Sequence, residues 1–322
     1  MRDTVITTPT SAAPGPGRWR APRWTLADAP RQDGRSAVVT GANAGLGFEV
    51  ALGLARLGAE VVLACRSTDR GLAAAARIRE AVPGARLAVR RLDLASLDSV
   101  AAFARDLRAE RRDLDLLVNN AGIMAVDEGR TADGHELQLG TNHLGHFALT
   151  ARLLPIMLTV PGSRVATMSS MGHRAGRLAP HDLMGTARGY GRWRAYFQSK
   201  LANLLFTAEL DRRLRAAAAS TVAVAAHPGA SRTDLGTEGT SAANGAMRRV
   251  VPALTQSAAT GALPMLRAIT ALEVAGGEYY GPRLVGLGHP VREVPSRRAR
   301  RAEDAQLLWA ASEQLTGITS PV

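Results

Sequence analysis

The amino-acid sequence predicts an α/β fold: a doubly wound parallel sheet in three layers, α/β/α, as a single domain. From Ser36 onward, short apolar runs of strand length alternate with longer stretches of helical period. The short runs are apolar on both faces, which is typical of parallel strands that helices cover on both sides. The alternation continues to residue 226 without an internal repeat. Because crossover connections between parallel strands are right-handed, these observations favour the doubly wound topology.

The alternation places each element in turn. We expect strands at 36–40, 60–64, 86–91, 114–118, 163–169 and 221–226, and helices near 46–57, 68–81, 96–111, 134–159 and 192–217. A last helix is expected at 302–317, where an apolar stripe could close a pocket or cover the sheet. Residues 1–23 are polar, proline-rich and non-periodic, which predicts a flexible tail before a domain at 24–322.

Composition narrows the class of protein. The 322 residues carry 40 Lys+Arg against 28 Asp+Glu, a formal net charge of +12, but the basic residues are scattered and only 4% of residues are aromatic. We therefore expect no nucleic-acid partner, since such proteins need a basic stripe and stacking aromatics. No apolar run is long enough for a membrane span or a signal peptide, so we expect no membrane anchor and a cytoplasmic protein. The lone cysteine, Cys65, excludes a disulfide framework and a cysteine-rich zinc site.

A glycine-rich turn, TGANAGLG at 40–47, follows the first expected strand and opens the first expected helix. Glycines at 41, 45 and 47 permit a tight turn whose backbone N–H groups approach a pyrophosphate at the helix N-terminus. Such a turn is also found as a purely structural strand–helix connection. In this context it predicts a dinucleotide site.

The second expected strand leads to Cys65 and Arg66, about 20 residues after the glycines, where dinucleotide folds meet the adenosine ribose. An acidic residue there would bind the ribose 2′-hydroxyl. Arg66 is instead a cation that can bind a 2′-phosphate with a forked geometry, and Arg70 adds charge nearby. We therefore expect NADP(H) to be favoured over NAD(H), the alternative being a surface arginine in an arginine-rich chain.

Tyr196 and Lys200 are four residues apart in an expected helix, so they share a face. A phenol has a pKa near 10, and lowering it by about three units takes roughly 4 kcal/mol. A cation about 4 Å away supplies about that much at an effective dielectric near 20. Lys200 is the only lysine in the chain and could poise Tyr196 for proton transfer. Two other tyrosines precede a cation by four residues, so the spacing alone is a weak indication.

These motifs occur in the order seen in one enzyme family. TGANAGLG, ACR, NNAGIM, DGHELQLGTNHLGHFALT, Ser169-Ser170, AYFQSKLANLLF and His227-Pro228-Gly229 resemble the short-chain dehydrogenases/reductases, which have a Rossmann fold. The resemblance runs from about Trp24 to the end, and it looks closest to the branch that contains retinol dehydrogenases and protochlorophyllide reductases. It implies an oxidoreductase that transfers a hydride between a nicotinamide and the carbonyl or alcohol of a small, lipophilic substrate.

The resemblance also implies roles for individual residues. Tyr196 would be the general acid–base, and Lys200 would lower its pKa and bind the nicotinamide ribose. Ser170 would hydrogen-bond the substrate oxygen, and Asn142 would hold a water that links Lys200 to solvent. In the cofactor cleft, residues 93–94 would contact adenine, 119 and 122 would line the cleft, and 228–229 with 233 would lie beside the carboxamide. The full cofactor set is Gly41, Asn43, Ala44, Gly45, Leu46, Gly47, Arg66, Asp93, Leu94, Asn119, Ala121, Gly122, Tyr196, Lys200, Pro228, Gly229 and Thr233.

Three expectations concern the rest of the chain. The insert at 171–194 would form one wall of the substrate pocket, and 230–257 would be a flexible loop over the cofactor. His143 and His146 could be a metal pair, but without a third ligand in view we expect hydrogen-bonded core histidines and no metal. The helices at 134–159 and 192–217 could pair in a homodimer or homotetramer or be covered within the chain.

Two other functions compete with this interpretation. An extended-type sugar-nucleotide epimerase or dehydratase shares the Tyr/Lys pair, but it usually has glycines spaced T-G-x-x-G-x-x-G, unlike positions 41, 45 and 47. A non-catalytic NADPH-binding regulatory protein would not need the complete set Asn142, Ser170, Tyr196 and Lys200.

Overall fold

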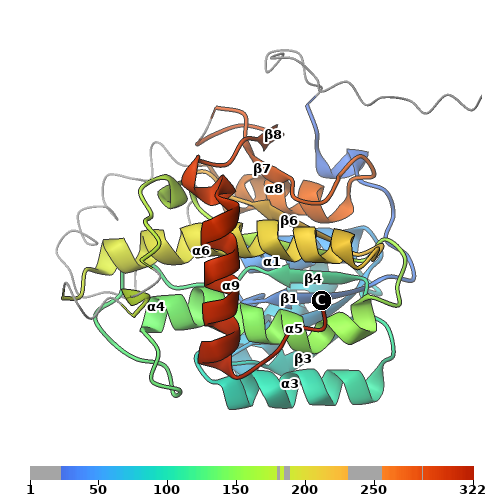
Figure 1. Ribbon diagram of the computed structural model, residues 1–322. Helices are drawn as coiled ribbons and strands as arrows, with labels where there is room; N and C mark the ends of the chain where they lie inside the picture. The colour runs from blue at the N-terminus through green and yellow to red at the C-terminus, as the bar shows by residue number, and fades with distance from the viewer. Residues whose placement is uncertain (1–22, 180–181, 185–188, 231–255, 285) are drawn as a thin grey trace, which may run out of the picture.

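The centre of the molecule is a parallel sheet, seen in the computed structural model, which describes residues 23–179, 182–184, 189–230, 256–284 and 286–322 (Figure 1). Within these ranges one eight-stranded sheet has the order β3-β2-β1-β4-β5-β6-β7-β8, and only β8 is antiparallel to its neighbour. The strands are β1 (Ser36–Thr40), β2 (Glu60–Cys65), β3 (Leu87–Arg91), β4 (Leu116–Asn119), β5 (Arg164–Met168), β6 (Val222–Ala226), β7 (Tyr279–Pro282) and β8 (Pro290–Glu293). The winding reverses between β1 and β4, and such folds bind ligands outside the carboxyl ends of the strands beside this switch point.

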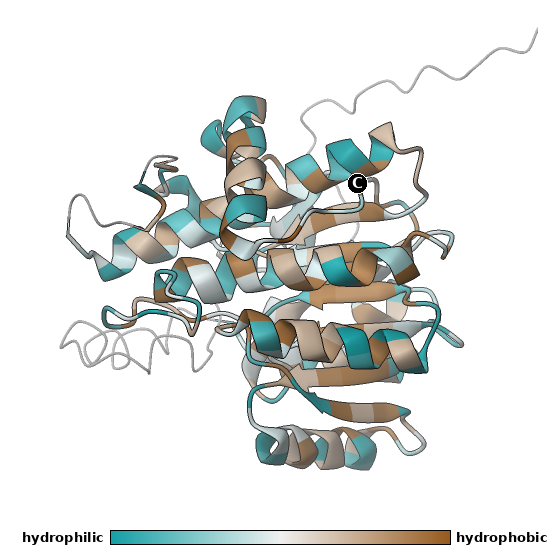
Figure 2. Cartoon of the chain, turned by 60° about the horizontal axis from the view of Figure 1, so that its bottom comes forward, coloured by the Kyte–Doolittle hydropathy of each residue, from teal (hydrophilic) through white to brown (hydrophobic). Residues whose placement is uncertain are grey.

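Helices cover both faces of the sheet, which confirms the three-layer prediction. One face packs against α1 (Gly45–Arg56), α2 (Thr68–Ala81) and α8 (Ala258–Thr270). The other face packs against α3 (Leu97–Glu110), α5 (Gly145–Met157) and α6 (Arg192–Ala216). Adjacent strand residues enter opposite cores, as Val38 and Val39 do, and both are fully buried. Figure 2 shows the result, with strands that are largely hydrophobic and helices that mix polar with apolar residues.

Serine caps start several of these helices. Ser67, Ser96 and Ser257 each accept a backbone N–H of the first turn, in α2, α3 and α8 respectively. Helix α1 begins after Ala44, which makes no such side-chain hydrogen bond. The first N–H groups of α1 therefore stay available to a ligand at the carboxyl end of β1.

The C-terminal helix α9 (Ala302–Thr316) packs across α6 and α5 on the outside of the second layer (Figure 1). Trp309 is buried there, stacked on Phe206 at 5.9 Å and edge-on to Phe147 at 5.1 Å, with the Arg213 guanidinium 4.5 Å from its ring. This helix therefore covers part of α5 and α6, which correspond to the expected helices 134–159 and 192–217. Its Ala305 and Leu308 also belong to a core cluster with Ala225 of β6 and Tyr279 of β7, and closure of a pocket stays a prediction.

The structure differs from the sequence expectations in two places, and two further expectations are left untested. The expected helix 134–159 is divided into a short turn α4 (Leu137–Leu139), a π-helical turn η2 (Gly140–Leu144) and α5. Helix α8 and strands β7 and β8 were not expected. Nearly all of the expected tail 1–23 and of the expected loop 230–257 lies outside the described residues.

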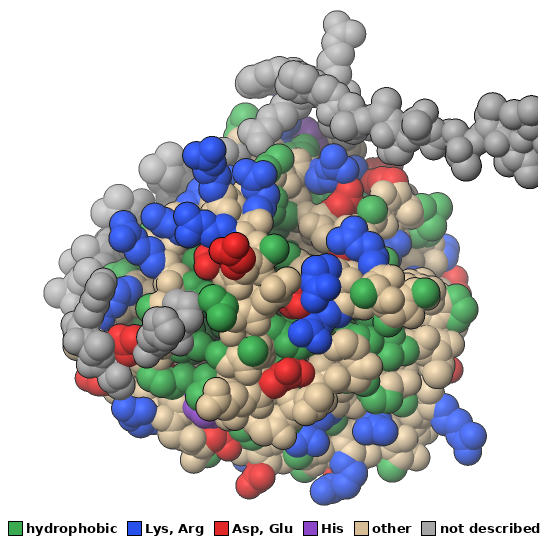
Figure 3. Space-filling view, in the orientation of Figure 1, with side chains coloured by type: hydrophobic (Ala, Val, Ile, Leu, Met, Phe, Trp, Pro, Cys, Tyr) green, Lys and Arg blue, Asp and Glu red, His purple; other side chains and the backbone are tan. Residues whose placement is uncertain are grey.

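Basic and acidic side chains are mixed on the face of the molecule in Figure 3. Figure 3 shows Lys and Arg side chains spread over the face in view, with Asp and Glu among them. Among helices in the described ranges, none combines the length and the apolar composition that crossing a membrane requires.

Candidate functional site

Helix α6 is fixed to the carboxyl end of β5 by side chains at the turn between them. The Ser169 hydroxyl donates to the Lys200 carbonyl at 2.8 Å, and the Asn203 amide donates to the Met168 carbonyl at 2.9 Å. Residues 196, 200 and 203 lie on one face of α6 because they are spaced by four and three. This docking carries Tyr196 and Lys200 to the edge of the sheet where ligands bind in such folds.

Tyr196, Lys200 and Ser170 come together at this edge, as the sequence predicts. The Lys200 Nζ lies 5.8 Å from the centre of the Tyr196 ring and donates to the Met168 carbonyl at 3.4 Å. The Ser170 hydroxyl hydrogen-bonds the Tyr196 phenol and also accepts the Gly172 N–H at 3.1 Å. Tyr196 and Lys200 are only 5% and 2% exposed.

Burial dominates the electrostatics of the pair. It raises the pKa of Tyr196, and the hydrogen bond from Ser170 opposes that rise only in part. Burial also lowers the pKa of Lys200 to about 8. In this structure the ammonium therefore does not make the phenol acidic, contrary to the sequence argument. At neutral pH the site holds a protonated phenol beside a cation that is costly to keep charged.

Asn142 lies within the same cluster, on the π-helical turn η2. Its side chain accepts the Ile123 N–H at 2.8 Å and donates to the Ile123 carbonyl and to the Ser199 hydroxyl, each at 2.9 Å. A Cβ built on Gly122 would lie 3.1 Å from Asn142 Oδ1 and 3.2 Å from Lys200 Nζ. Asn142, Gly122 and Lys200 therefore meet at one point, and the water expected at Asn142 stays a prediction.

A buried histidine that the sequence analysis assigned only to the core ties this cluster to β1. His146 is fully buried, and burial lowers its pKa to about 4, so the ring is neutral. Its Nδ1 is 3.0 Å from the Asn142 carbonyl and must donate, so Nε2 accepts from the Thr40 hydroxyl at 2.9 Å. Thr40 Oγ1 also accepts the N–H groups of Asn120 and Ala121, each at 2.9 Å. The sequence could have indicated the contact between His146 and Asn142, because the two residues are four apart in an expected helix.

In the glycine-rich turn, neighbouring groups lie too close to Gly47 to leave room for a side chain. Gly41 has φ +66°, and a Cβ on Gly47 would overlap the Gly41 carbonyl and lie 2.5 Å from Asn120 Nδ2. The Gly41 N–H donates to the Ala64 carbonyl at 2.8 Å, so the turn lies against the end of β2. The result is a narrow cradle of backbone, with Asn43, Ala44 and the uncapped first turn of α1 around it.

Arg66 follows β2 directly and is exposed beside this turn. Across the described part of the chain it makes no hydrogen bond or ion pair, so its guanidinium is available to an anion. Asp93 Oδ1 accepts the Ala95 N–H at 3.0 Å. This local hydrogen bond is an alternative to the contact with adenine that the resemblance implies. Leu94 is buried against Gly145.

The remaining predicted cofactor residues are divided between the cleft and the core. Asn119 is fully buried and donates its amide to the Thr150 hydroxyl at 2.9 Å, so its side chain points into the protein rather than into the cleft. Pro228 and Gly229 follow β6, which lies beside β5 and the serine turn. Thr233 lies outside the described residues.

Aromatic residues surround the phenol. Trp193 packs edge-on to Tyr196 at 6.2 Å and lies 5.7 Å from Phe197. A Cβ on Gly172 would lie 2.7 Å from the Phe197 ring and 3.4 Å from the Tyr196 ring. The described part of the insert 171–194 thus packs against the phenol, where we expect a substrate wall.

The histidine pair is part of the core. His143 Nε2 is 2.8 Å from the Ser312 hydroxyl, and burial lowers its pKa to about 3. No group of three His, Cys, Asp or Glu side chains in the described ranges is placed to hold a metal ion.

The family model described as short chain dehydrogenase matches residues 35–244. Human retinol dehydrogenase 13 is 39% identical over 294 residues, which are 89% of this chain and 86% of that protein. Human retinol dehydrogenase 12 is 40% identical over 287 residues, 88% of this chain and 87% of that protein. The match to mouse retinol dehydrogenase 11 is 46% identical over 202 residues and spans 63% of each chain.

Solved structures share the fold. A crystal structure of an uncharacterised protein from Mycobacterium paratuberculosis is 45% identical, with a TM-score of 0.79 over 93% of this chain and 100% of that chain. A short chain dehydrogenase from Shigella flexneri complexed with NADP is 23% identical, with a TM-score of 0.61 over 79% of this chain and 98% of that chain. The second likeness supports the fold alone.

The buried ammonium leads to a test by substitution. We expect Lys200→Met to abolish activity yet to raise the free energy of unfolding at pH 7 by on the order of 3 kcal/mol, from a lysine pKa lowered from 10.5 to about 8. Between about pH 8 and 10.5, Lys200 is protonated in the unfolded chain but not in the folded protein. The free energy of unfolding of the wild type therefore rises with pH through that window. Denaturant unfolding at pH 7 and pH 10 measures the change in stability and its pH dependence, and a turnover assay measures the loss of activity.

Lys200→Arg is the matched control, because a guanidinium keeps its charge throughout the pH range. Its stability should lack the rise between pH 8 and 10.5. Equal stability of the wild type and Lys200→Met at pH 7 would contradict a costly buried ammonium.

Proposed function

Because the chain belongs to the short-chain dehydrogenase/reductase family of oxidoreductases, we propose that it is an NADP(H)-dependent enzyme that interconverts a carbonyl and an alcohol on a small lipophilic substrate. The observation that carries the proposal is the meeting of Tyr196, Ser170 and Lys200 at the carboxyl edge of the sheet. A nicotinamide dinucleotide, when bound, supplies or accepts the hydride.

The chain offers a fitting site for the phosphates of a dinucleotide. The uncapped N-terminus of α1 presents backbone N–H groups, and the glycines leave a cradle that a Cβ would fill. Arg66, exposed and unpaired in the described part of the chain, favours a 2′-phosphate and therefore NADP(H). Asp93, Leu94, Ala121, Gly122, Pro228 and Gly229 remain proposed cleft residues on the basis of the resemblance.

The protein groups would handle the proton and the orientation of the substrate. Tyr196 is protonated at neutral pH, since burial raises its pKa, so it is poised to donate to a developing alkoxide. Ser170 would hydrogen-bond the same oxygen, and Lys200 would hold positive charge nearby. In the opposite direction Tyr196 would first have to lose its proton, and the phenolate would then accept the proton of the substrate hydroxyl.

Two observations favour a lipophilic substrate. Trp193 and Phe197 lie against Tyr196 and present aromatic surface beside the proposed reacting position. Two relatives that match 89% and 88% of this chain are named retinol dehydrogenases, whose named substrate is a lipophilic alcohol. Both support an apolar carbonyl or alcohol rather than a sugar nucleotide, and the glycine spacing supports the same choice.

The direct test combines Tyr196→Phe with a panel of aldehydes and ketones. We expect the wild type to consume NADPH with apolar members of the panel. Loss of the phenol should lower kcat by about 100- to 10,000-fold because no group then supplies the proton, while the Kd for NADPH stays the same. Stopped-assay product analysis and fluorescence titration measure the two quantities. Retained turnover in the variant would refute the role of Tyr196.

The role of Arg66 is tested by Arg66→Asp. We expect the ratio of kcat/KM for NADPH to that for NADH to fall by about 10- to 100-fold, since one charge-assisted contact to the 2′-phosphate is lost and a repulsion is added. Arg105→Asp makes the same charge change on an exposed position of α3 and serves as the control. An unchanged ratio in Arg66→Asp would rule out a 2′-phosphate contact.

A further inference from the structure

A second buried polar pair lies beside the site, where the turn after β6 meets β8. The Nε2 of His227 is 3.2 Å from the Glu293 carboxylate, and the two side chains are 1% and 5% exposed. Strand β7 lies between them without a side chain in the way, because a Cβ on Gly281 would overlap His227 Nε2 and lie 2.6 Å from Glu293 Oε1. The pair can form because position 281 is a glycine.

The hydrogen bonds fix the orientation of the imidazole. The Gly229 N–H donates to His227 Nδ1 at 3.2 Å, so Nδ1 carries no proton. The proton of a neutral ring is then on Nε2, where it donates to Glu293. A carboxylate behind a histidine holds both its tautomer and its plane. Through the ring, Glu293 thus fixes the backbone of the turn Pro228–Gly229.

Glu293 also reaches the neighbouring turn, which carries Ser170. Its other oxygen is 3.6 Å from the guanidinium of Arg174, the last residue of η3 (Met171–Arg174). His173, one residue earlier, donates from Nδ1 to the Ser170 carbonyl at 2.7 Å and accepts the Ser296 N–H at 3.3 Å. Strand β8 and the residues after it therefore contact both turns.

We propose that Glu293 and His227 are positioning residues that hold the turn Pro228–Gly229 in register with Ser170, so that the turn receives the nicotinamide end of the dinucleotide. The inference rests on the proposed function. Its physical basis is that β5 and β6 are adjacent parallel strands whose carboxyl ends form one edge, and Ser170 marks the reacting end of that edge through Tyr196.

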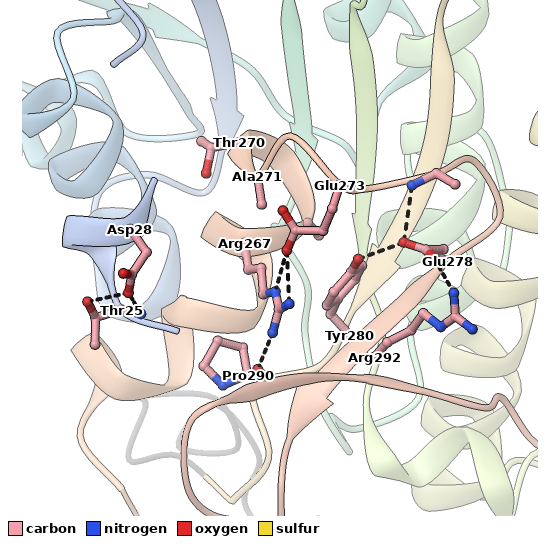
Figure 4. A network of polar contacts seen from close by, with 12 residues as sticks. Thr25, Asp28, Arg267, Thr270, Ala271, Glu273, Glu278, Tyr280, Pro290 and Arg292 are labelled. Carbon is pink, nitrogen blue, oxygen red and sulfur yellow. Dashed lines mark hydrogen bonds and ion pairs between the residues drawn. The ribbon is translucent and has the colours of Figure 1, made fainter. Parts of the chain in front are cut away.

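A purely structural role for Glu293 predicts a different outcome, and the chain contains a matched control. Glu278 precedes β7 and links β7 to β8, because it accepts from the Tyr280 hydroxyl and from Arg292, each at 2.6 Å (Figure 4). Its side chain is also largely buried, at 12% exposed, but its hydrogen bonds do not extend to the turn after β5 or the turn after β6. Removing Glu278 should loosen the hairpin without moving either turn.

The experiment compares Glu293→Leu with Glu278→Leu in the full chain, using two probes. NADPH contains the nicotinamide, whereas adenosine 2′,5′-bisphosphate carries the same 2′-phosphate without it. We expect Glu293→Leu to raise the Kd for NADPH about tenfold and to leave the Kd for the bisphosphate unchanged. Glu278→Leu should leave both constants unchanged. Calorimetric titration measures all of them, and the melting temperature of each variant reports the structural cost.

Glu293→Gln keeps an acceptor for His227 Nε2 and should restore most of the NADPH affinity, which a loss of packing would not explain. It also serves as the test if Glu293→Leu does not fold: a small selective rise in the Kd for NADPH is then expected. Equal weakening of both probes, or an unchanged Kd for NADPH in the Glu293 variants, overturns the inference. A wild type that binds neither probe overturns the proposed function as well.

Discussion

The site depends on the ammonium group of Lys200, which is almost completely buried. Lys200 is the only lysine in a chain that otherwise uses 39 arginines, and its Nζ sits 3.4 Å from the Met168 carbonyl and close to Asn142 and Gly122. Burying a charge is unfavourable unless neighbouring dipoles compensate, and a guanidinium could not release its proton there. The fold supports this group by fixing α6 to β5 through Ser169 and Asn203. The cation beside Tyr196 therefore lowers the stability of the folded protein at neutral pH.

Two polar links of similar design position the backbone around that cation. On one side, His146 joins Asn142 to Thr40 and so to the turn after β4. On the other side, His227 joins Gly229 to Glu293. In each link a buried imidazole has a backbone group as the partner of Nδ1 and a side chain as the partner of Nε2. Groups from residue 40 to residue 293 thus converge on one edge of the sheet, which makes the site a property of the whole fold.

The sequence predicts the elements that have a strong local pattern. Strands β1, β2, β4, β5 and β6 are recognisable because they are short, largely apolar runs that are buried almost throughout, and α1, α2, α3 and α6 begin and end within one or two residues of expectation. Strands β7 and β8 are four residues each and contain Gly281, Pro282 and Pro290, which weaken any strand pattern. The π-helical turn within 134–159 also has no period of its own, because the tertiary contacts of Asn142 determine it.

Site residues divide in the same way. Tyr196, Lys200 and Ser170 could be predicted to meet because motifs mark the ends of parallel strands, whereas the partners of His146 and His227 depend on contacts across more than 60 residues of sequence. The opposing effect of burial on Tyr196 and Lys200 could not be predicted either, since it depends on how deeply α6 docks. The sequence therefore predicts which side chains meet, and the depth at which α6 docks decides how burial shifts their pKa values.

The most direct measurement is the pKa of Lys200 itself. Because the chain has one lysine, protein grown with ¹³C-lysine gives a single Cε signal, and its pH titration by NMR reports this ammonium alone. We expect a midpoint at about 8 in the wild type, well below the ordinary 10.5. A signal that titrates near 10.5 would show an exposed, freely solvated amine and would contradict the claim that a buried cation organises the site.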